Sequence, residues 1–451
     1  MKTINPATEA VLAEYKMLDA RALNQNLDQV ALAQLQWRRV PLNDRISCIQ
    51  ALAKNLRDKA WVSAQMITAE MGKPISQALA ELEKCAHLCD YYANHADDLL
   101  AVEKIAGSYV EAQPLGVILG IMPWNFPFWQ VLRFAIPNLL LGNAVVIKHA
   151  PNTFGSAELL QRWFNEVFEN KFDTVFLNIL VDVDLVPNII QHPAITGVSL
   201  TGSARAGRVV AALAGQSLKK VVLELGGCDA YLILSDADLD LAAEQCVLSR
   251  LSNAGQICIA AKRIIVEAPI YAEFIQRIQK AAEPYVMGDP SQASCLLGPL
   301  ARADLRQHLH QQVEGLKASG AQCLMGGELP SCDGYYYPAT LFTDVSPDSL
   351  AFTEEIFGPV LAVTQAPNVQ AAINLANASP YGLAAAIFSQ DLERAEQLAR
   401  ESLMAGTVAV NHLVMSDPRL PFGGIKQSGF GRELGLAGIR EFANLKTIRL
   451  N

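Results

Sequence analysis

Cys258 lies in a sequence context that suits a reactive thiol. It ends the segment NAGQIC, where its neighbours are small or polar, whereas most cysteines occupy apolar runs. A cysteine thiolate can attack a carbonyl carbon and form a covalent intermediate. Because many cysteines only fill space in a core, the residue type alone leaves a structural role open.

Glu224 stands near the end of the apolar, strand-like run VVLELGG. Burial of a carboxylate in such a run disfavours its charged form and raises its pKa. A carboxylate with a raised pKa can act as a general base near neutral pH. A strand-end charge paired with a nearby lysine would give the same pattern, so both interpretations stay open.

Asn125 is the third candidate, in the segment PWNFP. Pro123 and Pro127 restrict the backbone on either side of it, which holds its amide in place. An amide N–H aimed into a cleft can stabilise an oxyanion. Capping of a turn is the alternative role for this residue.

Other clusters of polar residues are weaker candidates, and we expect no metal site. Cys85 and Cys89 in KCAHLCD share one helix face, but His87 between them points away, and no second pair of ligands follows. His308 and His310 are two residues apart and face different sides of a helix, which favours surface positions.

The spacing of apolar residues predicts an α/β protein. Residues 43–101 have the periodicity of long amphipathic helices, interrupted at Pro74. From about 115 to 227, strand-like runs alternate with helices, which indicates a parallel sheet covered on both faces. Within this region, Gly202 and Ser203 connect a strand to a helix whose N-terminus could bind phosphate. Any junction of this type looks alike, and the sequence contains no GxGxxG or GxxxxGK[ST] motif.

The alternation starts again after residue 227 and predicts a second α/β domain, followed by the strand-like C-terminal segment FANLKTIRL. Two such domains leave a cleft between them, where ligands commonly bind.

Composition excludes several classes of protein. The chain has 451 residues and a formal charge of −9, from 36 basic and 45 acidic residues, which disfavours nucleic acid and anionic membranes as partners. The apolar stretch 117–147 contains three prolines, Asn125 and Arg133, which a membrane-spanning helix would not tolerate cheaply. The first residues lack the pattern of a signal peptide, so we expect a cytoplasmic protein with reduced thiols.

Seven segments in order resemble the motifs of the aldehyde dehydrogenase superfamily. They are PWNFP (123–127), VVIKHAP (145–151), LTGS (200–203), LELGG (223–227), GQIC (255–258), EEIFGPV (354–360) and PFGGIKQSGFGRELG (421–435). The resemblance covers nearly the whole chain. It implies the aldehyde dehydrogenase fold, which combines a Rossmann-like cofactor domain, an α/β catalytic domain and a small β oligomerisation arm.

The resemblance also implies domain boundaries and assembly. The NAD(P)-binding domain is expected at residues 1–101 and 117–226, the catalytic domain at 227–420, and the arm at 102–116 and 421–451. The C-terminal strand is expected to join a neighbour's sheet in a homodimer or homotetramer.

The site residues take roles from the same resemblance. Cys258 is implied as the nucleophile, Asn125 as part of the oxyanion site, and Glu224 as the base that activates water. The implied NAD or NADP site is formed by Trp124, Lys148, Pro151, Gly202, Ser203, Leu225, Glu355 and Phe357.

Within the superfamily, the chain resembles the short bacterial succinate semialdehyde dehydrogenases that accept NAD or NADP. Pro151 replaces a glutamate that repels a 2′-phosphate in NAD-selective relatives, so we expect both cofactors to be used. Arg133 matches the first of two arginines that bind the substrate carboxylate in longer relatives, but Ser252 replaces the second. Arg419 is our candidate for the missing cation, with a surface loop charge as its alternative.

Three alternatives remain open at this point. The substrate could be another semialdehyde, such as glutarate semialdehyde, or a neutral aliphatic aldehyde. The chain could also be a non-catalytic relative that binds the cofactor.

Overall fold

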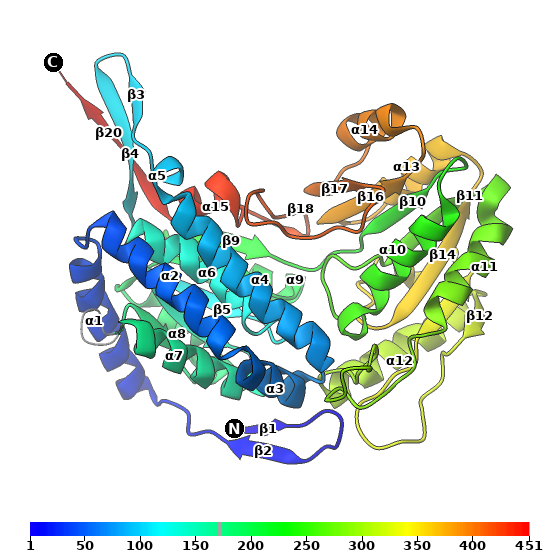
Figure 1. Cartoon of the computed structure of the whole chain (residues 1–451), viewed down its shortest axis with the longest axis horizontal. Coiled ribbons are helices and arrows are strands. Elements are labelled where there is room, and N and C mark those ends of the chain that lie inside the picture. The colour runs from blue at the N-terminus through cyan, green and yellow to red at the C-terminus, as the bar shows by residue number, and fades with distance from the viewer. Residues whose placement is uncertain (169–173, 451) are drawn as a thin grey trace.

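Two lobes, each with its own sheet, form the body of the molecule, and a small β-arm projects from the first lobe (Figure 1). The computed structural model describes residues 1–168 and 174–450. Residues 169–173, in the expected cofactor domain, and residue 451, at the end of the expected arm, lie outside the described residues.

The first lobe contains a six-stranded sheet. In spatial order its strands are β19 (Gly429–Phe430), β9 (Lys220–Glu224), β8 (Ile195–Thr201), β5 (Val117–Met122), β6 (Ala144–His149) and β7 (Phe176–Asn178). All neighbours pair in parallel except β19 and β9. The central strands β5 and β6 are almost continuously apolar because helices bury both faces of a parallel sheet.

Helices cover this sheet and form a further layer outside it. They are α1 (Ala20–Trp37), α2 (Leu42–Asp58), α3 (Ala60–Met71), α4 (Ile75–Asn94), α5 (Ala96–Leu99), α6 (Trp129–Leu141), α7 (Phe154–Phe168), α8 (Val186–Gln191) and α9 (Ala204–Gln216). Helices α1 and α6 contact β5 and β6, α9 contacts β8 and β9, and α4 packs against both α2 and α6.

Local sequence signals set several of these helix ends. Helix α3 ends at Gly72, whose φ of 74° suits a residue without a Cβ. Helix α4 starts directly after Pro74, the break predicted within 43–101. Asp19 caps α1 by accepting a hydrogen bond from the backbone N–H of Ala22 at 2.8 Å. Helix α1 lies before the predicted helical region and was not expected.

The second lobe contains a seven-stranded sheet. In spatial order its strands are β12 (Gln322–Met325), β13 (Thr340–Thr343), β14 (Val360–Ala366), β11 (Arg263–Glu267), β10 (Ala230–Ile233), β16 (Ala384–Phe388) and β17 (Thr407–Val410). Only the edge pair β12–β13 is antiparallel. The helices that follow β9 in the chain are α10 (Leu239–Leu251), α11 (Tyr271–Ala282), α12 (Ala303–Ala318), α13 (Val369–Asn377), α14 (Leu392–Glu401) and α15 (Gly435–Glu441).

The arm is a three-stranded antiparallel sheet in the order β20 (Ala443–Arg449), β4 (Ser108–Pro114) and β3 (Glu103–Ile105). Strand β20 pairs with β4 along its whole length, from Ala443 opposite Pro114 to Arg449 opposite Ser108. Figure 1 shows this arm extending away from the helices of the first lobe.

The first part of the expected C-terminal arm segment, residues 421–442, lies elsewhere. Strand β18 (Ile425–Lys426) pairs with β15 (Tyr381–Gly382), whereas β19 joins the six-stranded sheet through β9. Glycine makes the second pairing possible, because a Cβ on Gly429 would lie 1.9 Å from the carbonyl oxygen of Leu223. This segment therefore links the two lobes, and only β20 belongs to the arm sheet.

The N-terminal hairpin, β1 (Lys2–Ile4) and β2 (Val11–Glu14), also reaches the second lobe. The N–H of Tyr335 donates to the carbonyl oxygen of Pro6 at 2.7 Å, and the N–H of Gly334 donates to the Glu9 carboxylate at 3.1 Å. Among the described residues, no helix is both long and apolar enough to cross a membrane.

Candidate active site

The carboxyl ends of four parallel strands carry most of the predicted site residues of the first lobe. Strands β5, β6, β8 and β9 are neighbours in one sheet, so they end at the same edge, where ligands of α/β sheets commonly bind. Along this edge lie Trp124 and Asn125 after β5, Lys148 in β6, Gly202 and Ser203 after β8, and Glu224 and Leu225 at the end of β9.

Cys258 comes from the second lobe, between the short 3₁₀ turn η3 (Ser252–Gly255) and β11. Asn253 and Ala254 have φ values of 52° and 51°, a conformation that residues with a Cβ rarely adopt. Gly255 continues the turn, and a Cβ on it would lie 2.1 Å from the carbonyl oxygen of Gly358. This close packing holds the strained turn that presents Cys258.

Asn125 connects the first lobe to the Cys258 loop. Its Nδ2 donates to the backbone carbonyl oxygen of Gln256 at 3.0 Å. The backbone carbonyl oxygen of Asn125 accepts from Nδ2 of Asn253, also at 3.0 Å. An amide nitrogen carries two hydrogens, and the bond to Gln256 uses one of them. The second hydrogen is left for another acceptor.

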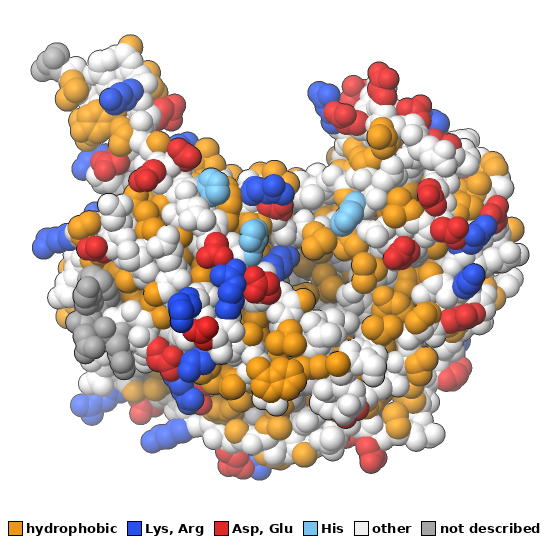
Figure 2. All heavy atoms as spheres, viewed as in Figure 1, with side chains coloured by type: hydrophobic (Ala, Val, Ile, Leu, Met, Phe, Trp, Pro, Cys, Tyr) orange, Lys and Arg blue, Asp and Glu red, His pale blue; other side chains and the backbone are white. Residues whose placement is uncertain are grey.

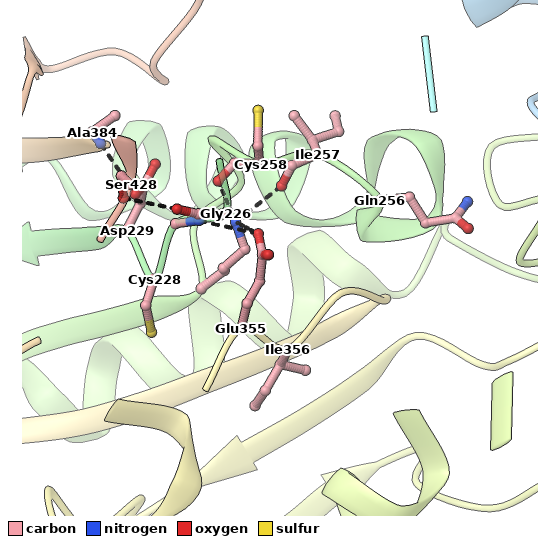
Figure 3. Close-up of polar contacts among 12 residues, drawn as sticks. Gly226, Cys228, Asp229, Gln256, Ile257, Cys258, Glu355, Ile356, Ala384 and Ser428 are labelled. Carbon is pink, nitrogen blue, oxygen red and sulfur yellow. Dashed lines mark hydrogen bonds and ion pairs between the residues drawn. The ribbon is translucent and has the colours of Figure 1, made fainter. Parts of the chain in front are cut away.

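The Cys258 thiol is half-buried, and burial raises its pKa to about 11. The positive charges of Lys262 and Arg133 offset part of this effect. Figure 3 shows the sulfur pointing away from the Glu355 carboxylate. In this state the side chain is a protonated thiol at neutral pH.

Lys262 and Glu355 form a buried ion pair beneath the Cys258 loop, with 3.1 Å between nitrogen and oxygen. Lys262 also donates to the carbonyl oxygens of Ile257, at 3.0 Å, and of Cys258. Glu355 accepts a hydrogen bond from the N–H of Gly227 at 3.2 Å (Figure 3). Lys262 is not among the residues expected from the sequence, although a cation four residues after the nucleophile is a usable signal.

Glu224 is 2% exposed, and neither of its carboxylate oxygens has a hydrogen-bond partner. Burial raises its pKa well above the usual value; Glu433 adds to the shift, and Arg133 opposes it. The sequence predicted a raised pKa for a carboxyl buried in this run, and burial is the largest cause of the shift.

Arg133 is buried on α6 and already has a carboxylate partner. Its guanidinium forms an ion pair with Glu433, packs 4.8 Å from the centre of the Phe422 ring and donates to Oγ1 of Thr201 at 3.5 Å. The charge that the sequence analysis assigned to the substrate is thus neutralised within the protein.

Arg419 does not lie in the buried site. Its side chain is 70% exposed and pairs with Asp417 in the same loop, at 2.5 Å. This geometry matches the alternative given for it, a surface loop charge. Ser252, which replaces the second arginine of longer relatives, donates its hydroxyl to the carbonyl oxygen of Leu248 at 2.6 Å.

The residues expected at the cofactor include an aromatic pair between the lobes and residues at the end of β6. Trp124 and Phe357, from different lobes, meet edge to face with 5.9 Å between ring centres. In the first lobe, Nζ of Lys148 donates to the carbonyl oxygen of His149 at 3.2 Å, and burial lowers its pKa. Pro151 begins a 3₁₀ turn, η1 (Pro151–Thr153), just after β6.

The junction after β8 fits a dinucleotide phosphate. Ser203 caps α9 by accepting from the N–H of Ala206 at 3.2 Å. A Cβ on Gly202 would meet its nearest neighbour only at 3.7 Å, so space is open beside the helix N-terminus. Free N–H groups and the dipole of this helix end attract phosphate, which fits NAD or NADP.

The model of the aldehyde dehydrogenase family matches residues 1–448. This chain belongs to the aldehyde dehydrogenase family. A succinate semialdehyde dehydrogenase [NAD(P)+] of Escherichia coli K12 is 45% identical over 99% of this aldehyde dehydrogenase and 97% of its own length. An NADP+ succinate-semialdehyde dehydrogenase of Deinococcus radiodurans is 41% identical over 99% and 94%.

Solved structures agree with the fold of this aldehyde dehydrogenase. The succinic semialdehyde dehydrogenase of Streptococcus pyogenes, solved with NADP+, superposes with a TM-score of 0.96 at 35% identity, over 99% of both chains. The family fold and the NAD(P)-dependent class of enzyme expected from the sequence are confirmed.

In the parts of the chain that the structure describes, no group of three or more His, Cys, Asp or Glu side chains is placed to hold a metal ion. Cys85 and Cys89 are fully buried in α4, where burial raises the pKa of both thiols.

Proposed function

We propose that this aldehyde dehydrogenase oxidises succinic semialdehyde to succinate with NAD or NADP. The observation that supports the chemistry most directly is the junction between the lobes, where the Cys258 loop is bonded to the Asn125 amide. The names of the relatives support the choice of substrate and cofactors.

Cys258 starts the reaction by attacking the aldehyde carbon with its sulfur, after loss of the thiol proton. The carbonyl oxygen becomes an oxyanion. It accepts hydrogen bonds from the second hydrogen of Asn125 Nδ2 and from the backbone N–H of Cys258. The Asn125 donor is fixed before the reaction, because its side chain is buried and hydrogen-bonded to Gln256.

Lys148, Gly202, Ser203 and Glu355 are the residues that we propose hold the dinucleotide, with Pro151, Leu225, Trp124 and Phe357 lining its site. When bound, the nicotinamide would supply the hydride acceptor that the oxidation requires. Lys262 and the N–H of Gly227 hold the Glu355 carboxylate in place, which supports a role for it at the nicotinamide-side ribose.

Glu224 then serves as the base for hydrolysis of the Cys258 thioester. Its burial without hydrogen bonds raises the pKa of the carboxyl. Once deprotonated, it can take a proton from the water that attacks the thioester carbon. The bond from that carbon to sulfur then breaks, which releases the carboxylic acid and returns Cys258 to its free form.

Pro151 supports use of both cofactors. No carboxylate stands at this position to repel a 2′-phosphate. The ammonium of Lys148, in the same segment of the chain, can attract such a phosphate. The ratio of NAD to NADP use then depends on Lys148.

Homo-oligomer formation through the arm belongs to the same proposal. Strand β20 is the outer strand of its sheet, and Leu445 on it is 51% exposed. Strand β17 is likewise the outer strand of the seven-stranded sheet. Unpaired edges of this kind accept a further strand, so β20 can extend a neighbour's sheet. We keep the proposed domains as 1–101 with 117–226 and 227–420, with the arm reduced to 102–116 and β20.

Formation of reduced cofactor by the purified protein tests the proposal. Succinic semialdehyde, glutaric semialdehyde and butanal are each offered with NAD and with NADP. We expect the highest kcat/KM for succinic semialdehyde, with measurable rates on both cofactors, and no rate for Cys258→Ala. Faster turnover of glutaric semialdehyde or of butanal would show that the proposed substrate is wrong. Activity retained in Cys258→Ala would contradict the mechanism.

A further inference from the structure

A half-buried lysine that was not among the residues expected from the sequence lies on the helix that packs against α6. Lys84 is on α4, and its Nζ donates to Oγ of Ser416 at 2.8 Å. The same ammonium stands 4.2 Å from the centre of the Trp129 ring. The aromatic face stabilises the cation without neutralising it.

Trp129 fixes where Lys84 lies in the site. Trp129 and Arg133 are four residues apart on α6, so their side chains share one face of that helix. Helix α4 packs against α6. The charge of Arg133 lowers the pKa of Lys84, and the charges of Cys85, Glu81 and Cys258 oppose that shift.

Lys84 has no carboxylate partner, in contrast to several other cations of this region. Lys73 is paired with Glu81, Arg133 with Glu433, Lys262 with Glu355 and Arg419 with Asp417. Among the described residues, no ion pair includes Lys84. Burial lowers its pKa to about 8, and Arg133 adds to that shift. A partly desolvated ammonium without a counter-charge is unfavourable, and an incoming carboxylate would offset part of that cost.

We propose that Lys84, together with the Ser416 hydroxyl, binds the distal carboxylate of the substrate and selects a semialdehyde over a neutral aldehyde. The inference rests on the proposed function. It assigns to Lys84 the role that the sequence suggested for Arg419. Nζ has three hydrogens, so it can keep its bond to Ser416 and still donate to the substrate.

Substitution Lys84→Met tests this role, because methionine keeps an unbranched side chain, one atom shorter, and removes the charge. We expect kcat/KM for succinic semialdehyde to fall by about 100-fold or more, mainly through KM, while kcat/KM for butanal changes less than about threefold. Lys84→Arg should retain most of the preference. Lys59→Met is the matched control, since Lys59 also lies over a tryptophan, with 5.2 Å from its Nζ to the Trp163 ring centre.

An equal loss on both aldehydes, or no loss on succinic semialdehyde, would overturn the inference. Thermal unfolding and cofactor binding show whether Lys84→Met is folded. If it is not, Ser416→Ala provides the second variant, with a smaller but equally selective loss expected.

Binding of succinate separates this inference from the proposed function. We expect succinate to slow alkylation of Cys258 by iodoacetamide in the wild type but not in Lys84→Met. If the wild type fails to oxidise succinic semialdehyde, the proposed function fails, and protection that depends on Lys84 would still support a carboxylate site. Protection that is equal in both proteins, or absent from both, would contradict the site itself.

Discussion

Cys258 is a resting thiol whose reactivity must depend on pH. Burial raises its pKa to about 11, so the thiolate fraction grows as pH rises towards that value. We expect the rate of alkylation of Cys258 by iodoacetamide, in the protein without ligands, to rise about tenfold per pH unit between pH 7 and 10. Mass spectrometry of the Cys258 peptide measures this rate separately from the other cysteines. A rate that levels off below pH 8 would contradict the raised pKa.

Glu224 separates the two halves of the proposed reaction. Glu224→Gln keeps the shape of the side chain but cannot accept a proton, so hydrolysis should fail after the oxidation step. We predict a burst of about one reduced cofactor per chain, followed by a steady rate lowered by about 10²–10⁴-fold. Rapid-mixing absorbance measures both phases. A loss of steady rate without any burst would assign Glu224 to the first half as well.

Lys84 should make substrate affinity depend on pH. Its pKa of about 8 is lowered from the usual lysine value, so the ammonium is present below about pH 8 and is lost above it. The groups that act on it are Arg133 from α6, Glu81 and Cys85 from its own helix, and Cys258. We expect KM for succinic semialdehyde to rise above about pH 8 while KM for butanal stays level. Parallel changes in both constants would point to another group.

Sequence reasoning found the residues whose local pattern carries the chemistry, such as Cys258 in GQIC and Asn125 in PWNFP. It did not find Lys84 or the Arg133–Glu433 pair, because these depend on contacts between segments far apart in the chain. For the same reason it could not show that Arg419 forms an ion pair with Asp417 at the surface. Charge alone cannot tell which cation lacks a partner.

At the scale of elements, the start of α6 decides where Asn125 lies. Glu81, on α4, accepts hydrogen bonds from the N–H groups of Phe128 and Trp129, both at 3.0 Å. Lys73 forms a fully buried ion pair with Glu81, and its ammonium lies 3.7 Å from the centre of the Phe126 ring. Helix α4 and the turn that precedes it therefore hold the loop that contains Asn125.

Lys73→Met should weaken that arrangement, because it leaves the buried Glu81 carboxylate without its cation. We expect the free energy of unfolding to fall by about 3–5 kcal/mol, as is typical when one partner of a buried pair is removed. Urea denaturation measures it. Lys54→Met, which removes an exposed pair with Asp58, is the control and should cost less than about 1 kcal/mol. Equal costs would show that the buried pair does not stabilise the loop.

The alternation of strands and helices could be predicted because buried parallel strands are continuous apolar runs, as in β5 and β6. The course of residues 421–442 could not, since their glycine-rich pairing with β9 depends on close approach to a strand about 200 residues earlier. Figure 1 shows how this segment runs between the lobes before the chain enters the arm.

At the scale of the whole molecule, the arm is the surface that we expect to be covered by another subunit. In Figure 2 the arm and the lobe that carries α14 stand on either side of a hollowed surface. Exposed apolar side chains on the arm include Ile105, Leu445 and Leu450. A second copy of the chain would bury them.

Removal of β20, by ending the chain after Phe442, should therefore reduce the size of the assembly. Light scattering after size-exclusion chromatography should give the mass of a smaller species than for the full chain. Thr447→Pro is the milder variant, because it removes one backbone donor from β20. An unchanged mass for both variants would show that the subunits meet elsewhere.

The most direct test of the central claim is the mass of the Cys258 peptide from Glu224→Gln after brief mixing with succinic semialdehyde and NAD or NADP. The account predicts one added succinyl group per chain, on Cys258, formed only when an oxidised cofactor is present. A succinyl group on another residue, or none on Cys258 while reduced cofactor accumulates, would contradict it.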